Sequence, residues 1–275
     1  MAGLTLTAPP KLNLRLLVGP RRPDGYHPLE TLMVALDGVA DEVTVAPAER
    51  RSVSCPGLDG PANLAWRALD ALEEEVRRPL PLAVTIVKRI PAQAGLGGGS
   101  SDAAATLVAA DRLLGLGLGP AALESVAARV GSDVPFFVRG GAQWARGRGE
   151  RLEPGGAPVF AALLAKPAAG LSTAAVYAAF DRLPPPPPAP RTPPPDGIDA
   201  LAGWVRNDLW PAALAMAPGL GATARALRAA GARGVLLCGS GTCLAGLFAG
   251  PEPARRAMRG LPGAGFRAVV TPRAG

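Results

Sequence analysis

The sequence predicts a folded chain of strands and helices that is organised in two halves. Its 275 residues suffice for one large domain or two ordinary ones. Short segments with a two-residue hydrophobic period occur beside longer segments with a helical period. After Val138 the pattern changes to glycine-rich turns, and a second half is expected to begin near Leu152.

The first half starts with a strand and a hairpin turn. Residues 11–16 alternate between polar and apolar, which predicts a half-buried strand with Lys11, Asn13 and Arg15 on one face. The Arg22-Pro23-Asp24-Gly25 sequence is typical of a turn, since Asp-Gly is a strong hairpin signal.

Helices and one further strand complete the first half. Asn63 is expected to cap a helix, and residues 82–88 to form a strand rich in β-branched side chains. A glycine-rich loop follows and leads into a helix over about residues 101–114. Pro120 opens a further helix that ends near Val130.

The second half shows a buried strand over residues 159–165 and helices around 199–216 and 221–230. The proline-rich residues 184–195 predict an extended surface loop, with an SH3-type ligand as the alternative. A strand-loop-strand unit over residues 234–248 closes this half.

The composition fits a folded protein despite 35 glycines and 31 prolines, because these are clustered and 48% of the chain is hydrophobic. A net charge of +7 suits polyanions or phosphorylated small molecules. The basic residues form isolated pairs rather than a stripe, so nucleic acid is not the expected partner.

The cysteines and the start of the sequence bear on the cellular compartment. Cys55, Cys238 and Cys243 are too few for a disulfide framework, which fits a reducing cytoplasm. His27 is the single histidine, so no second one can complete a zinc site. No signal peptide and no membrane span are expected, and the oligomeric state is left open between monomer and homodimer.

The strongest functional signal is the sequence PAQAGLGGGSS at residues 91–101, between a strand and a helix. Its four glycines allow backbone N–H groups to approach a ligand, and the helix adds its positive N-terminal end. These features predict a polyphosphate-binding loop, with a tight strand-to-helix turn as the structural alternative. The loop lacks the lysine of a Walker A sequence and the glycine spacing of a dinucleotide-binding fold.

Two more residues extend this signal. Asp133 precedes an X-Pro step that is expected to enter an apolar strand, and Lys11 begins the first strand. Either could be structural only, with Asp133 bonded to local backbone and Lys11 solvated. Together with the loop they indicate phosphoryl transfer, in which Lys11 neutralises charge and Asp133 accepts a hydroxyl proton.

The GLGGGSS sequence at residues 95–101 resembles the central motif of the GHMP kinases, which include galactokinase, homoserine kinase and mevalonate kinase. LCGSGTC at residues 237–243 is similar to the third motif of that family. Four further sequences resemble the branch that acts on a cytidine diphosphate ester of methylerythritol. They are APPKLNL at 8–14, RPDGYH at 22–27, GSDVPFF at 131–137 and Asn207-Asp208. Pro10, where alanine is usual, and the insertion at 184–195 depart from the pattern.

The resemblance implies a two-domain α+β fold with the active site in the cleft. Residues 1–152 would form an ATP-binding domain like domain 2 of ribosomal protein S5, and residues 153–275 an α/β domain on the substrate side. The implied reaction is ATP-dependent phosphorylation of the substrate's 2-hydroxyl, in the non-mevalonate route to isoprenoid precursors. Mg²⁺ is expected, with its ligands unidentified and Asp102 one acidic candidate near the loop.

The resemblance also assigns roles to individual residues. Lys11 and Asp133 match the catalytic pair. The positions that match ATP-binding residues are Pro91, Ala92, Gln93, Ala94, Gly95, Leu96, Gly97, Gly98, Gly99, Ser100, Ser101, Asn63, Leu64 and Lys88. The positions that match substrate-binding residues are Asn13, Tyr26, His27, Tyr177, Gly239 and Ser240.

Two alternatives stay open at this point. One is another small-molecule kinase of the same family, of the homoserine or mevalonate type. Tyr26 and His27 argue against it, because an aromatic ring stacks on a pyrimidine and an imidazole offers donor and acceptor edges to it. The other is a non-catalytic, basic S5-like binding module, against which the intact glycine loop argues.

Overall fold

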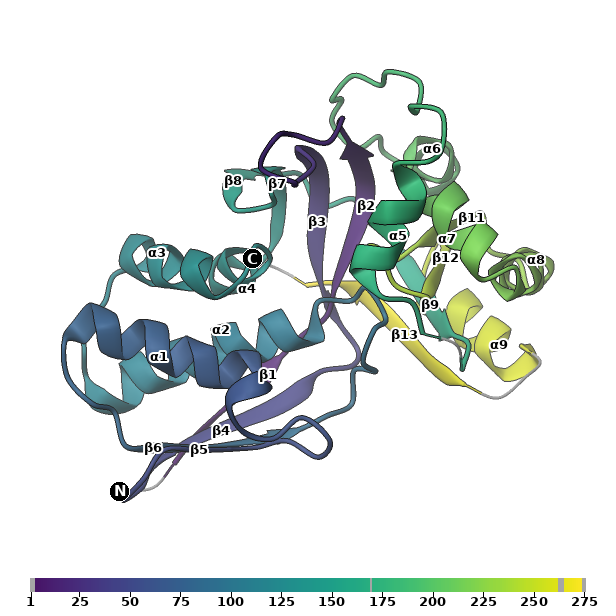
Figure 1. Ribbon diagram of the computed structural model, residues 1–275. Helices are drawn as coiled ribbons and strands as arrows, with labels where there is room; N and C mark the ends of the chain where they lie inside the picture. The colour runs from purple at the N-terminus through teal and green to yellow at the C-terminus, as the bar shows by residue number, and fades with distance from the viewer. Residues whose placement is uncertain (1–2, 169, 262–264, 274–275) are drawn as a thin grey trace. The chain divides into compact units, whose positions relative to one another are not determined.

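The computed structural model describes residues 3–168, 170–261 and 265–273, which form two compact units (Figure 1). The first unit comprises residues up to Pro10, Ala40–Ala92 and Gly97–Gly140. The second comprises Lys11–Val39, Gln93–Leu96 and the residues from Gly141 onward. Where the two family domains divide along the sequence stays a prediction, since these units are defined by spatial proximity.

The first unit is a four-stranded sheet covered by helices on one face (Figure 1). The strand order is β1-β4-β6-β5, with only the β5–β6 pair parallel. Helices α1 and α2 pack on the sheet, and α3 and α4 pack on them. The elements are β1 (Leu4–Ala8), β4 (Asp41–Pro47), β5 (Ser52–Ser54), η1 (Gly60–Ala62), α1 (Leu64–Val76), β6 (Leu82–Val87), α2 (Gly98–Leu114), α3 (Pro120–Val130) and α4 (Val134–Arg139).

The helix starts in this unit follow local sequence rules. Asn63 caps α1, as predicted, because its side chain accepts a hydrogen bond from the Ala65 N–H. Helix α2 begins at Gly98, three residues before the predicted start, after Gly97 in the left-handed conformation (φ 74°). The last four residues of the predicted glycine loop, 98–101, therefore form the first helical turn.

Residues 134–139 form helix α4, so the predicted apolar strand after Asp133 was wrong. Pro135 lies in the first turn of this helix, where a missing N–H costs nothing and a fixed φ fits. Phe136 is fully buried. A short apolar run has the same appearance in a buried helix as in a buried strand, which explains the error.

The second unit contains a nine-stranded sheet with the path β10-β2-β3-β13-β9-β12-β11, and β7 pairs with both β3 and β8. Helix α9 packs against β9 and β13, and α8 against β11 and β12. The elements are β2 (Lys11–Val18), β3 (Leu29–Asp37), β7 (Ala142–Gly147), β8 (Arg151–Pro154), β9 (Ala161–Lys166), α5 (Thr173–Phe180), α6 (Ile198–Trp204), β10 (Arg206–Asn207), α7 (Trp210–Met216), α8 (Gly219–Ala229), β11 (Gly234–Leu237), β12 (Leu244–Phe248), α9 (Pro251–Gly260) and β13 (Phe266–Pro272).

Strand β2 is confirmed, but it is buried on both faces rather than half-buried. Lys11, Asn13 and Arg15 are each at most 8% exposed. Asn13 Nδ2 donates to Thr31 Oγ1 (2.9 Å), and Arg15 Nη1 donates to the Trp204 carbonyl (2.7 Å), although Arg15 Nε has no partner among the described residues. Satisfied hydrogen bonds allow a polar face to be buried, and an alternating pattern does not reveal them.

The turn between β2 and β3 is confirmed, with the Gly25 N–H donating to the Arg22 carbonyl (2.9 Å) and Gly25 at φ 84°. The strand-loop-strand unit is also confirmed as β11 and β12. The predicted helix over 199–216 is instead two short helices, because Arg206 and Asn207 pair with β2 as β10.

The proline-rich residues 184–195 form no helix or strand and lie partly exposed, as predicted. Side chains hold this segment in place: Arg206 Nη2 donates to the Pro187 carbonyl (2.8 Å), and Trp204 Nε1 donates to Thr192 Oγ1 (2.8 Å). The segment is therefore anchored by specific bonds.

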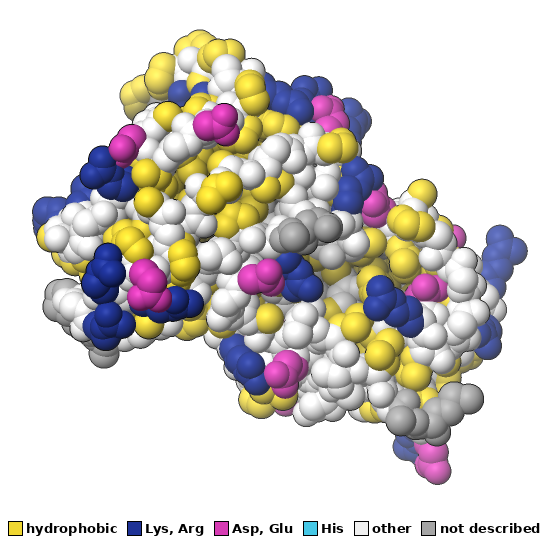
Figure 2. Space-filling view, turned by 180° about the vertical axis from the view of Figure 1, so that it is seen from behind, with side chains coloured by type: hydrophobic (Ala, Val, Ile, Leu, Met, Phe, Trp, Pro, Cys, Tyr) yellow, Lys and Arg dark blue, Asp and Glu magenta, His cyan; other side chains and the backbone are white. Residues whose placement is uncertain are grey.

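On the face shown in Figure 2, Lys and Arg side chains lie in scattered groups, many beside an Asp or Glu. Ion pairs of this kind in the first unit include Arg129–Glu75 and Arg139–Glu124. Within the described part of the chain, no helix combines the length and the apolar character needed to cross a bilayer.

Candidate active site

Two glycine-containing loops interlock in the second unit. The Thr242 N–H donates to the Gln93 carbonyl (3.4 Å), which joins the residue 93–96 segment to the loop between β11 and β12. A Cβ atom at Gly95 would lie 1.6 Å from the Cys238 carbonyl oxygen, and one at Gly241 would lie 2.2 Å from backbone of Ala94. These two glycines are therefore required by backbone packing, whether or not a ligand is bound.

Lys11 lies against these interlocked loops. Its Nζ donates to Asn13 Oδ1 (2.6 Å) and to the Gly95 carbonyl (3.0 Å), and its backbone N–H donates to the Leu96 carbonyl (2.9 Å). A Cβ at Gly239 would lie 3.3 Å from this Nζ. The structure thus brings Lys11, Asn13 and Gly239 together, and Lys11 is not a solvated surface lysine.

The first turn of α2 presents backbone donors in the first unit. Gly98, Gly99, Ser100 and Ser101 form this turn, and the earliest N–H groups of a helix have no partner within the helix. The positive end of the helix dipole lies at the same place. An anion is therefore favoured here, which supports the phosphate prediction for this part of the sequence.

Beside this turn, Lys88 lies between two buried carboxylates. Its Nζ pairs with Asp41 and with Asp102 Oδ2 (2.7 Å). Burial lowers the pKa of Lys88, but the Asp102 and Asp41 carboxylates outweigh that effect and the net pKa is raised. Burial raises the pKa of Asp102 from 3.8 to about 7, although the Lys88 ammonium opposes this shift.

Two buried oxygens in the same place lack a partner. Among the residues that the structure describes, Ser101 Oγ and Asp102 Oδ1 form no hydrogen bond. Unpaired buried polar atoms are costly, and they call for an explanation such as an unseen ion or ligand. Nowhere in the described ranges do three or more His, Cys, Asp or Glu side chains gather as a metal site.

The predicted nucleotide residues of the first unit come together. A Cβ at Gly98 would lie 3.3 Å from Lys88 Nζ, and one at Gly99 would lie 3.6 Å from Leu64 Cδ1. Asn63 precedes Leu64, and its Nδ2 donates to the Leu58 carbonyl (2.9 Å) while its Oδ1 caps α1. Asn63 therefore has a structural role besides any ligand contact.

Tyr26 and His27 differ in exposure. Tyr26 is 52% exposed, with the Arg148 guanidinium 5.1 Å from its ring centre. His27 is only 8% exposed, and both ring nitrogens are engaged: Nδ1 with the Gly19 carbonyl (3.0 Å) and Nε2 with Asp181 Oδ1 (3.1 Å). In this arrangement the imidazole edges are used within the protein, and Tyr26 offers the accessible ring.

Helix α5 connects two of the predicted substrate-binding regions. At its start, Thr173 Oγ1 and Ser240 Oγ share a hydrogen bond (2.8 Å). One turn later, the Tyr177 ring lies 5.2 Å from that of His27, between centres. Thr173 and Tyr177 are four residues apart, which is a rise of about 6 Å along the helix axis.

Asp133 lies in the first unit, immediately before α4, and its side chain does not cap that helix in the described part of the chain. Lys11 belongs to the second unit. The pairing of Lys11 with Asp133 therefore stays a prediction.

Several residues of these clusters were missed from the sequence. Asp41, Arg148, Thr173 and Asp181 carry no local motif, and only the fold brings them beside Lys88, Tyr26, Ser240 and His27. Arg148 lies in the Arg-Gly-Arg-Gly turn that the sequence marked only as a turn. No signal in a single sequence identifies the other three.

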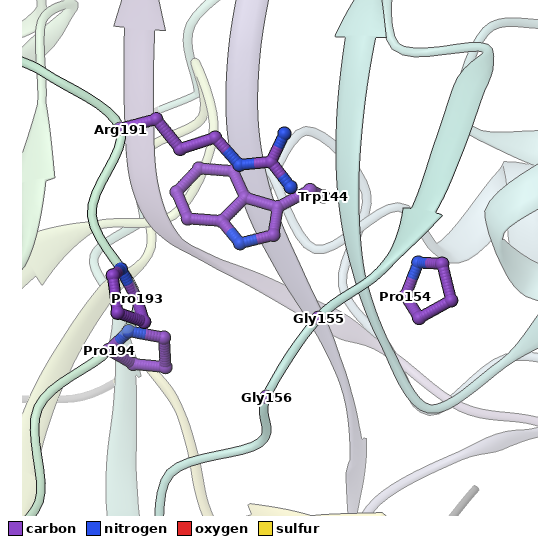
Figure 3. A pocket seen from close by; sticks show the side chains of 7 residues that line it. All are labelled: Trp144, Pro154, Gly155, Gly156, Arg191, Pro193 and Pro194. Atoms are coloured by element: carbon purple, nitrogen blue, oxygen red, sulfur yellow. The ribbon is translucent and has the colours of Figure 1, made fainter.

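A cavity of about 470 Å³ in the second unit involves none of the predicted site residues (Figure 3). The Arg191 guanidinium lies 4.7 Å from the centre of the Trp144 ring, so a cation already covers this aromatic surface. The lining residues are Trp144, Pro154, Gly155, Gly156, Arg191, Pro193 and Pro194.

Comparison with known families defines the class of protein. The model of the GHMP kinase N-terminal domain matches residues 63–141, which include the first turn of α2 and Asp133. The model of the GHMP kinase C-terminal domain matches residues 198–267, which include the interlocking loop after β11. The fold is that of a GHMP kinase.

Relatives narrow the class further. The 4-diphosphocytidyl-2-C-methyl-D-erythritol kinase of Rhodococcus jostii is 42% identical over 97% of this chain and 91% of its own length. The kinase of the same name from Geobacter metallireducens is 41% identical, and the match covers 100% of this chain and 99% of that protein. A crystal structure of 4-(cytidine 5'-diphospho)-2C-methyl-D-erythritol kinase superimposes with a TM-score of 0.79, at 37% identity over 98% of this chain and 99% of that one. The chain belongs to the 4-diphosphocytidyl-2-C-methyl-D-erythritol kinase family.

Two glycine substitutions should have opposite effects on stability. Gly99→Ala should keep or slightly raise the melting temperature, because a Cβ there meets only Leu64 Cδ1 at 3.6 Å and alanine favours a helix. Gly95→Ala should lower the melting temperature sharply, because the added Cβ would clash with the Cys238 carbonyl. Circular dichroism melts of both variants test this, and equal losses would contradict the interlock.

The raised pKa of Asp102 predicts a pH effect on stability. Between about pH 4 and 7 the folded chain keeps this proton while the unfolded chain loses it, so Asp102 contributes less stability as pH rises. The difference in unfolding free energy between the wild type and Asp102→Asn should therefore fall over this range. Urea denaturation at several pH values measures this difference in unfolding free energy. A difference that stays constant or rises with pH would refute the raised pKa of Asp102.

Proposed function

We propose that the chain transfers the γ-phosphoryl group of ATP to the 2-hydroxyl of 4-diphosphocytidyl-2-C-methyl-D-erythritol, a step of the non-mevalonate route to isoprenoid precursors. The observation that carries the proposal is the near-complete coverage by relatives of that name at about 40% identity. The buried Lys11 and the phosphate-favouring start of α2 supply the chemistry that such a transfer requires.

ATP is expected at the start of α2, with residues 91–101 around its phosphates. The N–H groups of Gly98, Gly99 and Ser100 would bind phosphate oxygens, which a helix N-terminus favours. Asn63 and Leu64 would lie near the adenine, because Leu64 is beside Gly99. Lys88, held by Asp41 and Asp102, would add positive charge to this region.

Mg²⁺ fits the two unpartnered oxygens in the same region. Ser101 Oγ and Asp102 Oδ1 are hard oxygen donors, which Mg²⁺ prefers, and it commonly takes one or two protein ligands together with substrate phosphates. We propose these two residues as its protein ligands. The bound ion would neutralise charge on the phosphates.

Lys11 and Asp133 are proposed to act on the reacting groups. Lys11 is held by Asn13 and Gly95, so its ammonium is fixed in place and can stabilise developing negative charge. Asp133 would accept the proton of the attacking hydroxyl. In a loose phosphoryl-transfer transition state, positioning and charge stabilisation supply most of the catalysis, so an ordinary carboxylate suffices.

The cytidine end of the substrate is assigned to the second unit. The exposed Tyr26 ring would stack on the pyrimidine, with His27 and Tyr177 supporting that side. Asn13, Gly239 and Ser240 would contact the substrate toward the reacting hydroxyl. Helix α5, which carries Thr173 beside Ser240 and Tyr177 beside His27, suits an extended, diphosphate-linked molecule.

We expect the enzyme to work in the cytoplasm as a monomer or homodimer. Cys55, Cys238 and Cys243 are free and buried, which fits a reducing compartment. The scattered ion pairs give no reason to expect a nucleic acid or a membrane as partner.

Analysis of the product tests the proposed reaction directly. Purified protein is incubated with ATP, Mg²⁺ and 4-diphosphocytidyl-2-C-methyl-D-erythritol, and the product is examined by ³¹P and ¹³C NMR. A new phosphomonoester signal, with phosphorus coupling at C2 of the methylerythritol, is expected. A phosphate on another hydroxyl, or ADP release without a phosphorylated product, would contradict the proposal.

Asp133→Asn should lower kcat about 10²- to 10⁴-fold, because the isosteric amide cannot accept the hydroxyl proton. ATP affinity should be largely kept, since the phosphate-binding groups are unchanged. Steady-state kinetics with both substrates, together with calorimetric ATP titration, measure the two effects. Near-normal turnover in a folded variant would remove Asp133 from the mechanism.

Tyr26→Ala should raise KM for the cytidine substrate and leave KM for ATP unchanged, because only the former would stack on this ring. Tyr26→Phe keeps the aromatic face and serves as the matched control, with KM expected near the wild-type value. If alanine raised both KM values equally, Tyr26 would be a structural residue.

A further inference from the structure

Asp181 contacts His27 at the base of the turn that carries Tyr26. The turn is closed by the Gly19 N–H donating to the Pro28 carbonyl (2.8 Å). On its inner side the His27 ring bridges Gly19 and Asp181 through its two nitrogens. His27 therefore ties the turn to the end of helix α5.

The two contacts engage the two ring nitrogens of His27 differently. A carbonyl oxygen can only accept a hydrogen bond, so the contact with Gly19 places a proton on Nδ1. Nε2 then attracts the Asp181 carboxylate only when a second proton lies between them. Asp181 thus favours one orientation of the imidazole, with Nε2 toward the carboxylate.

The position of Asp181 on its helix is unfavourable by itself. It is the C-cap residue of α5, where the negative end of the helix dipole disfavours a carboxylate. The nearby cationic partners are His27 and Arg21, whose Nη1 lies 3.9 Å from Asp181 Oδ2. Asp181 therefore occupies this position against the electrostatic preference of the helix end, which points to a role in the site.

The aromatic contacts place α5 against the same imidazole. The Tyr177 ring centre lies 5.2 Å from that of His27 in a tilted arrangement, and the Phe180 ring meets it edge-on at 5.8 Å. If the Asp181 contact were lost, the ring would be free to rotate away from Gly19. Tyr26, the next residue along the chain, would then lose its fixed support.

We propose that Asp181 is a positioning residue for the cytidine end of the substrate. Through His27 it fixes the turn that presents Tyr26 and orients Tyr177 on α5. This inference rests on the proposed function, because it assigns the pyrimidine to Tyr26.

Kinetics of Asp181→Asn and Asp181→Ala test the role. Asp181→Ala should raise KM for the cytidine substrate about tenfold, the scale of one charged hydrogen bond, while kcat and KM for ATP stay within about twofold. Asp181→Asn, which keeps the shape, should give a smaller rise in KM. Asp199→Asn removes a surface carboxylate paired with Arg233 and should leave all constants at wild-type values.

Nitrogen NMR gives a second readout that a general structural role would not produce. His27 is the single histidine, so untagged protein labelled with ¹⁵N-histidine shows one pair of ring nitrogens. Nδ1 should carry a proton in both proteins, and Asp181→Asn should change the Nε2 resonance.

These experiments distinguish failure of the positioning role from failure of the proposed function. An unchanged KM for the cytidine substrate in both Asp181 variants, or an equal rise in both KM values, would overturn the positioning role while leaving the proposed function intact. Failure of the wild type to use the cytidine substrate would instead overturn the proposed function, and this inference with it.

Discussion

The backbone contact between residues 93–96 and the loop after β11 is the constraint on which the second unit's part of the site depends. Gly95 and Gly241 approach so closely that neither position can hold a side chain. The Gly95 carbonyl that this contact fixes accepts a hydrogen bond from Lys11 Nζ, as does Asn13 Oδ1. The contact therefore determines where the buried Lys11 ammonium lies. Asn207 supports the same loop by donating to the Leu237 and Gly239 carbonyls (2.9 and 2.7 Å).

The glycine-rich sequence serves two physical purposes. Gly95 allows close packing of backbone on backbone, and Gly97 adopts a left-handed conformation that starts α2. Gly99 is different, because a Cβ there would meet no clash. An absent side chain at a position with room for one is consistent with close approach of a ligand. The buried oxygens of Ser101 and Asp102, left without partners one turn into the same helix, are consistent with a bound ion.

Much of the fold followed from local patterns, and the exceptions have physical causes. The cap at Asn63, the turn at Gly25 and the β11–β12 unit are all marked by short-range chemistry. The helix at 134–139 was mistaken for a strand because four apolar residues have no period, and β10 was missed because its two residues exist only through pairing with β2. In the site, the motifs identified Lys11 and the α2 start. Asp41 and Asp181 required the tertiary structure, since each acts through a residue far away in the sequence.

The proposed cytidine site would distinguish this chain from kinases that share only its fold. The exposed Tyr26 ring, next to the engaged His27, is the proposed stacking surface for the pyrimidine. The most direct test of this account is ATP-dependent ADP release with 4-diphosphocytidyl-2-C-methyl-D-erythritol, homoserine and mevalonate in parallel. Turnover with the cytidine compound alone is predicted. Turnover with homoserine or mevalonate instead would contradict the assignment of Tyr26 and of the substrate.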